Sequence, residues 1–200
     1  MHKLLFAVGA LAVLSTAARA VEFEIDPAHS QVGFKIKHVT GKVLGRFTGF
    51  SGSFAYDKKD VKSWKAEAKI DPASVNTDNE KRDGHLKSPD FFDVAKFPEM
   101  SFRSTKVDVA KNGRAKLYGD LTMHGVTKPV VLDLEIGGVD KDPWGNETAG
   151  FSAVGAIRRK DWGIVWNKTL DSGGFLIGET VDVALEISGN AKKAGAPSGK

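Results

Sequence analysis

Residues Asn76–Ser104 (NTDNEKRDGHLKSPDFFDVAKFPEMSFRS) interrupt a chain whose other segments alternate between apolar and polar residues. The Thr77-x-x-Glu80 spacing predicts a helix that begins there, because the threonine hydroxyl and the glutamate carboxylate can cap each other's backbone amides. Ser88–Asp90 repeats the signal, since serine suits an N-cap and proline suits the first helical turn. Two short helical turns, end to end, are therefore expected.

The same segment carries a large apolar load. Its apolar side chains are Leu86, Phe91, Phe92, Val94 and Phe97. An exposed crossover would leave this surface in water, so burial against the rest of the molecule is favoured. We expect the segment to lie on the body of the protein as a lid.

On both sides of the lid, apolar residues recur at every second position, which is typical of strands. The predicted strands cover residues 22–39 (with a break at Asp26-Pro27), 44–56, 64–70, 100–110, 117–124, 130–136, 151–157 and 181–187. Asn112-Gly113 favours a tight hairpin between the fourth and fifth strands. Glycines within residues 44–56 indicate bends where a sheet curls.

Eight strands with mostly short connections predict an all-β protein, an eight-stranded antiparallel barrel with a short helical lid segment between strands 3 and 4. Closing the sheet removes its edges. Many of the inward candidates are small, namely Gly33 or Ala66, Ala68, Gly119, Ala153 and Gly155, and small residues would leave a lumen. By the same parity, the predicted tunnel lining is Phe34, Ile36, Trp64, Ile70, Phe102, Leu121, Leu132, Leu134, Phe151, Val183 and Leu185.

The N-terminus has the pattern of a secretory signal peptide. A basic start, a short apolar run and Ala18-Arg19-Ala20 predict cleavage before Val21 and export to a bacterial periplasm. No later segment is apolar enough to predict a membrane span. We expect residues 1–20 to be the cleaved signal, residues 21–189 the folded domain and residues 190–200 a disordered tail.

Composition narrows the class of protein further. The chain has no cysteine, so the fold depends on a buried core and not on disulfides. The formal charge of +4 arises at the ends of the chain: without Lys3, Arg19 and the three lysines of the tail, 24 basic residues face 25 acidic ones. A nucleic-acid surface would need clustered basic charge on the folded body, and none is predicted.

Four segments together resemble the YceI-like family of periplasmic polyisoprenoid-binding proteins. They are Ile25–His38 (IDPAHSQVGFKIKH), Asp83–Pro98 (DGHLKSPDFFDVAKFP), Gly119–Pro129 (GDLTMHGVTKP) and Arg159–Ile164 (RKDWGI). The resemblance implies an extended lipocalin-like barrel whose tunnel holds a long isoprenoid or similar lipid, with the lid near the mouth. The family positions carried over are His85, Leu86, Phe91, Phe92, Phe97, Arg159 and Trp162.

An amphiphilic lipid is accordingly the expected partner. A polyisoprenoid, an isoprenoid quinone or a fatty-acid-like lipid is expected as ligand, with no cofactor, no metal and no nucleic acid. Phe91, Phe92, Phe97 and Trp162 join the expected apolar lining. A transient membrane contact is compatible with this role, and the oligomeric state, with a dimer as one option, stays open.

The head group of such a lipid needs donors at the mouth. Arg82 and His85 stand three residues apart on the predicted lid helix and share a face, so they could bind a diphosphate or a quinone oxygen. The alternative is a surface pair of Asp78 with Arg82, with His85 capping the helix or packing against the protein. Arg158 and Arg159 offer a second clamp, or else belong to a solvated loop.

Two other classes of function remain open. Asp83, His85 and Ser88 form the most plausible catalytic trio for a lipid-modifying hydrolase, although helix capping explains their clustering and no established catalytic motif is present. An extracytoplasmic carbohydrate-binding or stress-response interaction module would present exposed aromatic residues. The expectation from the sequence is a non-enzymatic lipid carrier.

Overall fold

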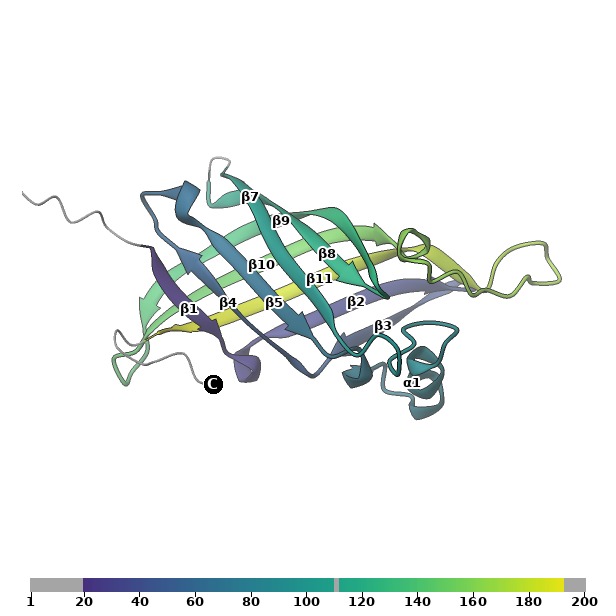
Figure 1. Cartoon of the computed structure of the whole chain (residues 1–200). Helices are drawn as coiled ribbons and strands as arrows, with labels where there is room; N and C mark the ends of the chain where they lie inside the picture. Colours follow the sequence, from purple (N-terminus) through teal and green to yellow (C-terminus); the bar gives the residue numbers. More distant parts are fainter. Residues whose placement is uncertain (1–19, 110–111, 193–200) are drawn as a thin grey trace, which may run out of the picture.

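The computed structural model describes residues 20–109 and 112–192, which form one elongated antiparallel β-barrel (Figure 1). The strands are β1 Val21–Ile25, β2 Gln31–His38, β3 Gly41–Phe47, β4 Phe50–Tyr56, β5 Lys65–Ile70, β6 Val75–Asn76, β7 Met100–Val109, β8 Arg114–Met123, β9 Val126–Lys141, β10 Glu147–Arg158 and β11 Ile177–Ala191. The helix α1 spans Glu80–Lys87. Short 3-10 turns are η1 Pro27–His29, η2 Val61–Ser63, η3 Pro72–Ser74 and η4 Arg159–Trp162.

The barrel closes in the order β1-β4-β5-β7-β8-β9-β10-β11, and β11 pairs again with β1. The remaining strands lengthen the first three. β2 continues β1, because both pair with β11. β3 continues β4, because β3 pairs with β2 and β4 pairs with β1. β6 continues β5, because β6 pairs with β3 and β5 pairs with β4. The predicted eight-stranded antiparallel barrel is therefore confirmed, with three of its strands each broken into two parts.

The lid lies between the third and fourth strands, as predicted, but its local structure differs from the prediction. Asn79, not Thr77, caps α1, and its side chain accepts from the amide of Arg82 at 3.0 Å. No second helix begins at Ser88. Ser88 ends α1 with extended backbone (φ −74°, ψ 170°), because a residue that precedes proline disfavours helical angles.

The last strand ends later than predicted, and the predicted hairpin turn is present. β11 continues to Ala191, which pairs with Phe23, so the folded domain extends past the predicted limit at residue 189. Asn112 and Gly113 both have positive φ (66° and 72°), as the predicted hairpin turn requires. The expected signal peptide, apart from residue 20, and residues 193–200 of the expected tail lie outside the described residues.

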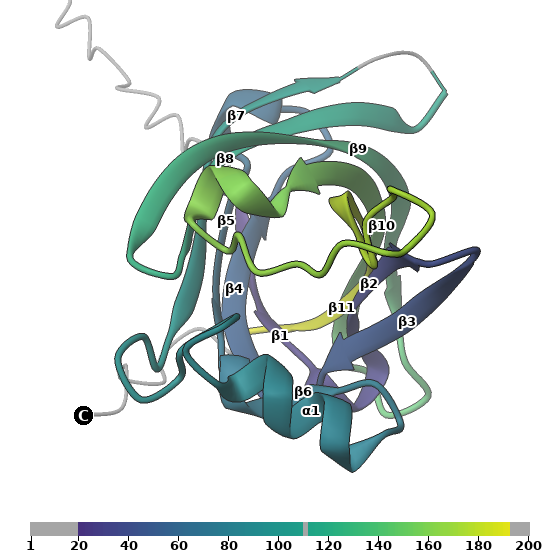
Figure 2. The same cartoon turned by 90° about the vertical axis from the view of Figure 1, so that its right-hand side faces the viewer.

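The two ends of the barrel differ. At the end where β1 begins and β11 stops, Phe23, Phe54, Tyr56 and Ala149 form a buried cluster, in which the rings of Phe23 and Phe54 stack 5.2 Å apart. At the opposite end, α1 lies below the opening and residues 163–176, the late loop, cross it (Figure 2). No helix within the described residues is long and apolar enough to cross a membrane.

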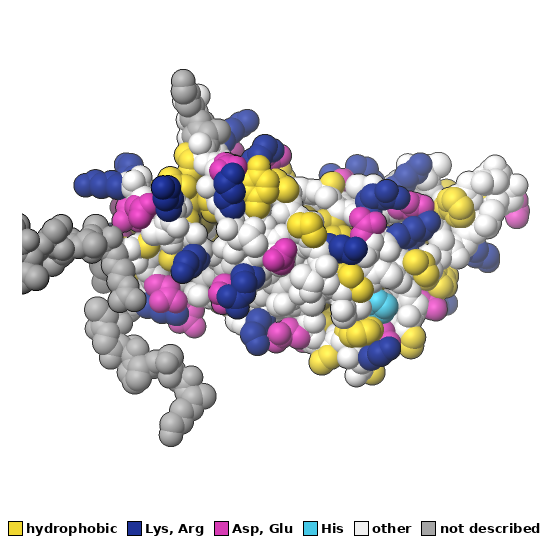
Figure 3. All heavy atoms as spheres, turned by 45° about the horizontal axis from the view of Figure 1, so that its top comes forward, with side chains coloured by type: hydrophobic (Ala, Val, Ile, Leu, Met, Phe, Trp, Pro, Cys, Tyr) yellow, Lys and Arg dark blue, Asp and Glu magenta, His cyan; other side chains and the backbone are white. Residues whose placement is uncertain are grey.

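The outer face of the barrel is charged and mixed in sign. Lys, Arg, Asp and Glu side chains are interspersed over the face shown in Figure 3. Cross-strand pairs such as Arg103 with Glu67 (2.8 Å) and Lys116 with Asp133 (2.7 Å) account for part of this pattern. The side of each strand that faces away from this surface is apolar, and it encloses the candidate site.

Candidate functional site

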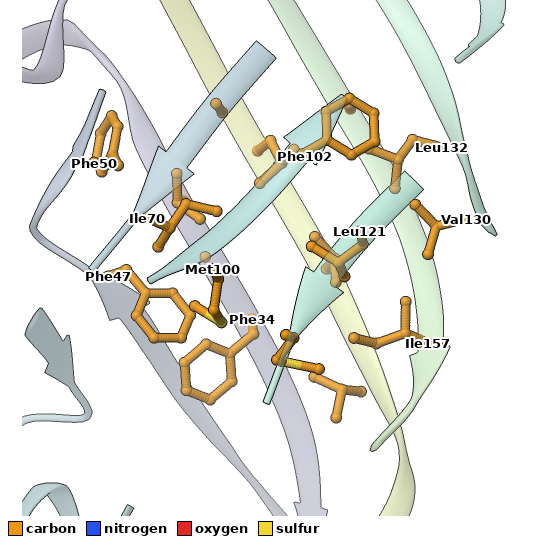
Figure 4. Close-up of a pocket in the computed structure, with 18 of the residues that line it drawn as sticks. Phe34, Phe47, Phe50, Ile70, Met100, Phe102, Leu121, Val130, Leu132 and Ile157 are labelled. Atoms are coloured by element: carbon orange, nitrogen blue, oxygen red, sulfur yellow. The ribbon is translucent and has the colours of Figure 1, made fainter. Parts of the chain in front are cut away.

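A cavity of about 400 Å³ runs through the barrel toward the lid, and its lining is mainly apolar. Figure 4 shows that side chains from several strands, among them Phe34, Phe102, Leu121 and Ile157, point into the same space. Polar residues also line it: Thr77, Arg82, His85 and Arg159 belong to the lid and to η4, and His38, Ser53, Lys65 and Glu67 belong to the barrel strands. A long apolar molecule that carries a polar group would match this lining.

Most residues predicted to line the tunnel do so. The lining includes Phe34, Ile36, Trp64, Ile70, Phe91, Phe92, Phe102, Leu121, Leu132, Leu134, Phe151, Val183 and Leu185. Because side chains alternate between the two faces of a strand, one wrong register would have moved a whole strand's set to the outside. The predicted faces are therefore correct on every strand from which these residues come.

Phe97 and Trp162 were placed in the lining wrongly. The ring of Phe97 packs on His124 at 4.5 Å, outside the cavity, where it also covers Gly125. Trp162 is 2% exposed, but its Nε1 donates to the backbone oxygen of Leu121 at 3.1 Å and its ring packs in the core beside the cavity. Both lie outside regular strands, where alternation gives no facing information.

Other lining residues were missed by the sequence prediction. They include Phe47, Met100, Met123, Val130, Ile157, Ile164, Trp166, Leu176 and Ile177. Val130 shares the parity of Leu132 and could have been found by the same rule. Trp166 comes from the late loop, which has no periodic pattern and therefore gives no signal of this kind.

Two glycines make room for the aromatic residues of the wall. A Cβ on Gly45 would lie 2.3 Å from the ring of Phe34, and a Cβ on Gly119 would lie 2.4 Å from the ring of Phe102. The rings thus occupy the space that a side chain at either position would need. Of the small residues expected to leave a lumen, Gly33, Ala66, Ala68 and Ala153 line the cavity, whereas Gly119 and Gly155 do not.

The lid is held by a buried hydrogen-bond network around Thr77, which is 5% exposed. The carboxylate of Asp83 accepts from the amide of Thr77 (2.9 Å) and from its hydroxyl (2.6 Å). The guanidinium of Arg82 donates to the hydroxyl (2.7 Å) and the carbonyl (2.8 Å) of the same residue. These contacts, and not a capping box, fix the start of the lid.

Replacing Thr77 by alanine is expected to loosen the lid. The change removes the hydroxyl that serves Asp83 and Arg82, and a lost buried hydrogen bond to a charged group costs about 1.5–3 kcal/mol. Amide hydrogen exchange in residues 80–87 should become faster by a corresponding factor. Thr127→Ala is the matched control, because the hydroxyl of Thr127 contacts only Thr122 on the exposed surface. Equal exchange in both variants would contradict this role of Thr77.

His85 joins the lid to the late loop. Its ring lies 5.0 Å from the ring of Phe91 and 4.8 Å from that of Trp166, and its Nε2 is 2.8 Å from a carboxylate oxygen of Asp90. Of the alternative considered from the sequence, the packing of His85 is found, but the pair of Asp78 with Arg82 is not, since Asp78 pairs with Arg46 at 3.4 Å. Arg82 and His85 both line the cavity, but polar atoms of both are bonded within the lid. Their binding to a lipid head group stays a prediction.

The suggested catalytic trio is not assembled. Asp83 is bonded to Thr77, and the hydroxyl of Ser88 donates to the backbone oxygen of His85 at 2.8 Å, not to its ring. His85 faces Asp90 instead of Asp83. A hydrolase would need the base within hydrogen-bond reach of the nucleophile, so these contacts do not support that hypothesis.

Arg159 is the most deeply buried charged residue among those described, with 3% exposure. Its Nε donates to the carbonyl of Gly178 (2.9 Å), and its Nη1 donates to the carbonyls of Ile164 and Trp166 (2.8 Å each). The side chain thereby ties η4 to the late loop and to the start of β11. It also lines the cavity, as the sequence predicted for a head-group residue.

Burial and the neighbouring charges act on Arg159 in opposite directions. Burial lowers the pKa of its guanidinium from the ordinary value, and the negative charge of Glu179 acts in the opposite direction. Glu179 is itself bonded to Lys160 and Arg158, which lower the pKa of its carboxyl. The side chain of Arg158 is 64% exposed and does not line the cavity, so its contact with a head group stays a prediction that the cavity does not support. The last residue of β10 points outward, and the next one turns inward.

Known proteins resemble this chain in sequence and in structure. A UPF0312 protein of Vibrio parahaemolyticus is 38% identical over 197 residues, which cover 96% of this chain and all of that protein. A Campylobacter jejuni YCEI protein superposes with a TM-score of 0.67 at 38% identity, covering 84% of this chain and 96% of that one. A polyisoprenoid binding domain from Saccharophagus degradans shares the fold, with a TM-score of 0.61 at 17% identity over 87% of this chain and 100% of that one.

The family model for the YceI-like domain matches residues 23–189, from the first strand of the barrel almost to the end of β11. This match spans the lid, the cavity lining and η4 together. The chain therefore belongs to the YceI-like domain family.

Proposed function

We propose that this protein binds one amphiphilic lipid, with the apolar tail inside the barrel cavity and the polar end at the lid. The observation that carries the proposal is the cavity itself, a lumen of about 400 Å³ in which apolar side chains dominate. A protein interior is normally filled to close packing. An apolar space kept open along a barrel therefore favours an apolar ligand.

Membership of the YceI-like family supports the same proposal, and so does the fold shared with the polyisoprenoid binding domain of S. degradans. Isoprenoid, quinone or fatty-acid-like tails would all gain about 0.8 kcal/mol per buried methylene before ordering costs. Tail burial can dominate affinity without selecting a head group. Selection then depends on the polar atoms at the lid.

The role that fits these features is a carrier or store outside the cytoplasm. Residues 1–20 have the pattern of a cleaved signal, which favours a periplasmic location. The unassembled Asp83, His85 and Ser88 trio favours binding without chemistry on the ligand. Incubation with a polyprenyl diphosphate should accordingly release no phosphate.

Mass spectrometry of the exported protein tests the proposal. The full chain is expressed in a bacterial host, the periplasmic fraction is purified without added lipid, and both the intact protein and its solvent extract are analysed. We expect a protein that begins at Val21 and an extract that contains an amphiphilic lipid close to one per chain. An extract free of lipid, together with no uptake of a long-tailed fluorescent lipid by the delipidated protein, would exclude the binding role. Retained residues 1–20 would exclude only the export.

A further inference from the structure

The guanidinium of Arg159 has donors to spare. An arginine carries five N–H donors, one on Nε and two on each terminal nitrogen. The one on Nε and the two on Nη1 are used for the carbonyls of Gly178, Ile164 and Trp166. Nη2 is buried, and no hydrogen-bond partner for it lies within residues 20–109 and 112–192.

This arrangement is costly in the absence of a further partner. A buried polar group that lacks a hydrogen bond destabilises the protein, and a buried charge does so more strongly. Across the described part of the chain, no carboxylate lies within 4.0 Å of Arg159, and Glu179 is occupied by Lys160 and Arg158. The three acceptors that Arg159 has are neutral carbonyls. Among the described residues its positive charge therefore has no direct ion-pair partner in the wall of the cavity, and Glu179 acts on it only from a longer distance.

The guanidinium of Arg159 lies where the polar end of a ligand in the cavity would be expected. Arg159 lines the cavity together with Ile164 and Trp166, and Trp166 contacts His85 of the lid. The charge is thus beneath the junction of lid and late loop, inside the mouth and not on the exposed rim. Arg82, the other arginine of the lining, already donates from Nε and Nη2 to Thr77.

We infer that Arg159 recognises the polar end of the ligand, and that this end is an anionic oxygen group, a carboxylate or a phosphate. The inference rests on the proposed lipid-binding function and adds the class of head group to it. A neutral carbonyl or hydroxyl would satisfy the donors of Nη2 but not the charge. An anionic oxygen satisfies both, and charge-assisted hydrogen bonds to guanidinium groups are the stronger kind.

A series of ligands with the same tail tests the head group on the unaltered protein. Geranylgeraniol, geranylgeranoic acid and geranylgeranyl monophosphate compete for the delipidated protein against a fluorescent long-tailed probe. We expect the acid, the phosphate or both to bind at least about tenfold more tightly than the alcohol, as one charge-assisted hydrogen bond implies. The two anionic arms distinguish a fatty-acid-like source from a prenyl phosphate. Affinities within threefold across the series would overturn the inference while leaving lipid binding intact, whereas failure of all three to displace the probe would count against the proposed function itself.

Substitutions of Arg159 and of Arg158 then show which residue is responsible for the preference for an anionic head group. Arg159→Met should bring the acid and the phosphate to the affinity of the alcohol, and Arg158→Met, which removes the same charge from the outer surface and leaves Glu179 paired with Lys160, should keep the wild-type preference. Arg159→Met loses the bonds to Gly178, Ile164 and Trp166 and could fail to fold for that reason. Arg159→Lys, which retains the charge with fewer donors, then tests whether this side chain supplies the preference for an anionic head group. In that variant the preference should fall but not vanish. An undiminished preference in either Arg159 variant would overturn the assignment.

Salt provides an independent readout. Exposed charge pairs are largely screened at high ionic strength, whereas buried pairs are screened much less. The preference for an anionic head should therefore persist at about 0.5 M salt if Arg159 supplies it. A preference that disappears at that concentration would place recognition at exposed groups and contradict the role of Arg159.

Discussion

Leu121→Trp is expected to exclude a long lipid from the cavity while the barrel still folds. Leu121 lies on β8 opposite Phe102 of β7, and both side chains point into the lumen (Figure 4). An indole at this position takes space that the tail would occupy. Forcing a side chain against a filled space costs about 1–3 kcal/mol, which corresponds to roughly a 5- to 150-fold loss of lipid affinity.

The fold has reason to survive this change. The bond from Trp162 goes to the backbone oxygen of Leu121, which the substitution retains, and the added ring enters open cavity. Lipid content after purification and affinity for a long-tailed fluorescent probe are the measurements. Val131→Trp is the control, since Val131 is exposed on the outer face of β9 and should keep full lipid content. An unchanged lipid content in Leu121→Trp would mean that the ligand does not pass this point of the barrel.

Phe23→Ala is expected to have the largest effect on stability. Phe23 is fully buried at the end of the barrel opposite the lid, where its ring stacks on Phe54 and where β1 joins β4 to β11. Replacing a buried phenylalanine by alanine costs about 3–5 kcal/mol, a large part of the roughly 5–15 kcal/mol by which proteins of this kind are stable. The midpoint of urea unfolding of the lipid-free protein should fall accordingly.

The comparison with an exposed valine isolates burial as the cause. Val154 is 55% exposed on β10, and Val154→Ala should change the free energy of unfolding by no more than about 0.5 kcal/mol. Lipid must be absent in these experiments, because a ligand bound to the native state adds its own stabilisation. A midpoint shift for Phe23→Ala as small as that for Val154→Ala would show that burial of Phe23 at this end does not stabilise the barrel.

Regular alternation explains why the barrel and most of its lining could be predicted from the sequence. Leu132 and Leu134 on β9, or Val183 and Leu185 on β11, face the lumen because a strand places every second side chain on the same side. The pattern does not show how long a strand is paired or where it breaks. Hence residues 44–56 were predicted as one strand, although β3 and β4 are separated at residues 48–49, and β11 was ended too early.

The start of the lid helix was predicted wrongly because two residues that suit an N-cap lie close together there. Thr77 and Asn79 both suit an N-cap, and the sequence does not reveal that the hydroxyl of Thr77 is engaged by Asp83 and Arg82 inside the protein. Phe97 was misplaced for a related reason, since turns give no fixed side-chain direction. Contacts that depend on tertiary structure override the local signal in both cases.

The basic run Arg158–Lys160 shows the same limit at the candidate site. Three adjacent basic residues suggest a solvated loop or a clamp, and alternation ends where β10 ends. The structure separates them: Arg158 and Lys160 pair with Glu179, while Arg159 turns into the protein to hold the late loop. A buried arginine with two free donors could not have been inferred from the run alone.

A crystal structure of the protein purified without delipidation would show the bound lipid in place. We expect continuous elongated density within the cavity, in contact with Phe102, Leu121 and Leu132, and ending at an anionic group within hydrogen-bond distance of Nη2 of Arg159. Density on the outer surface of the barrel, or a cavity filled by the protein's own side chains, would contradict this expectation.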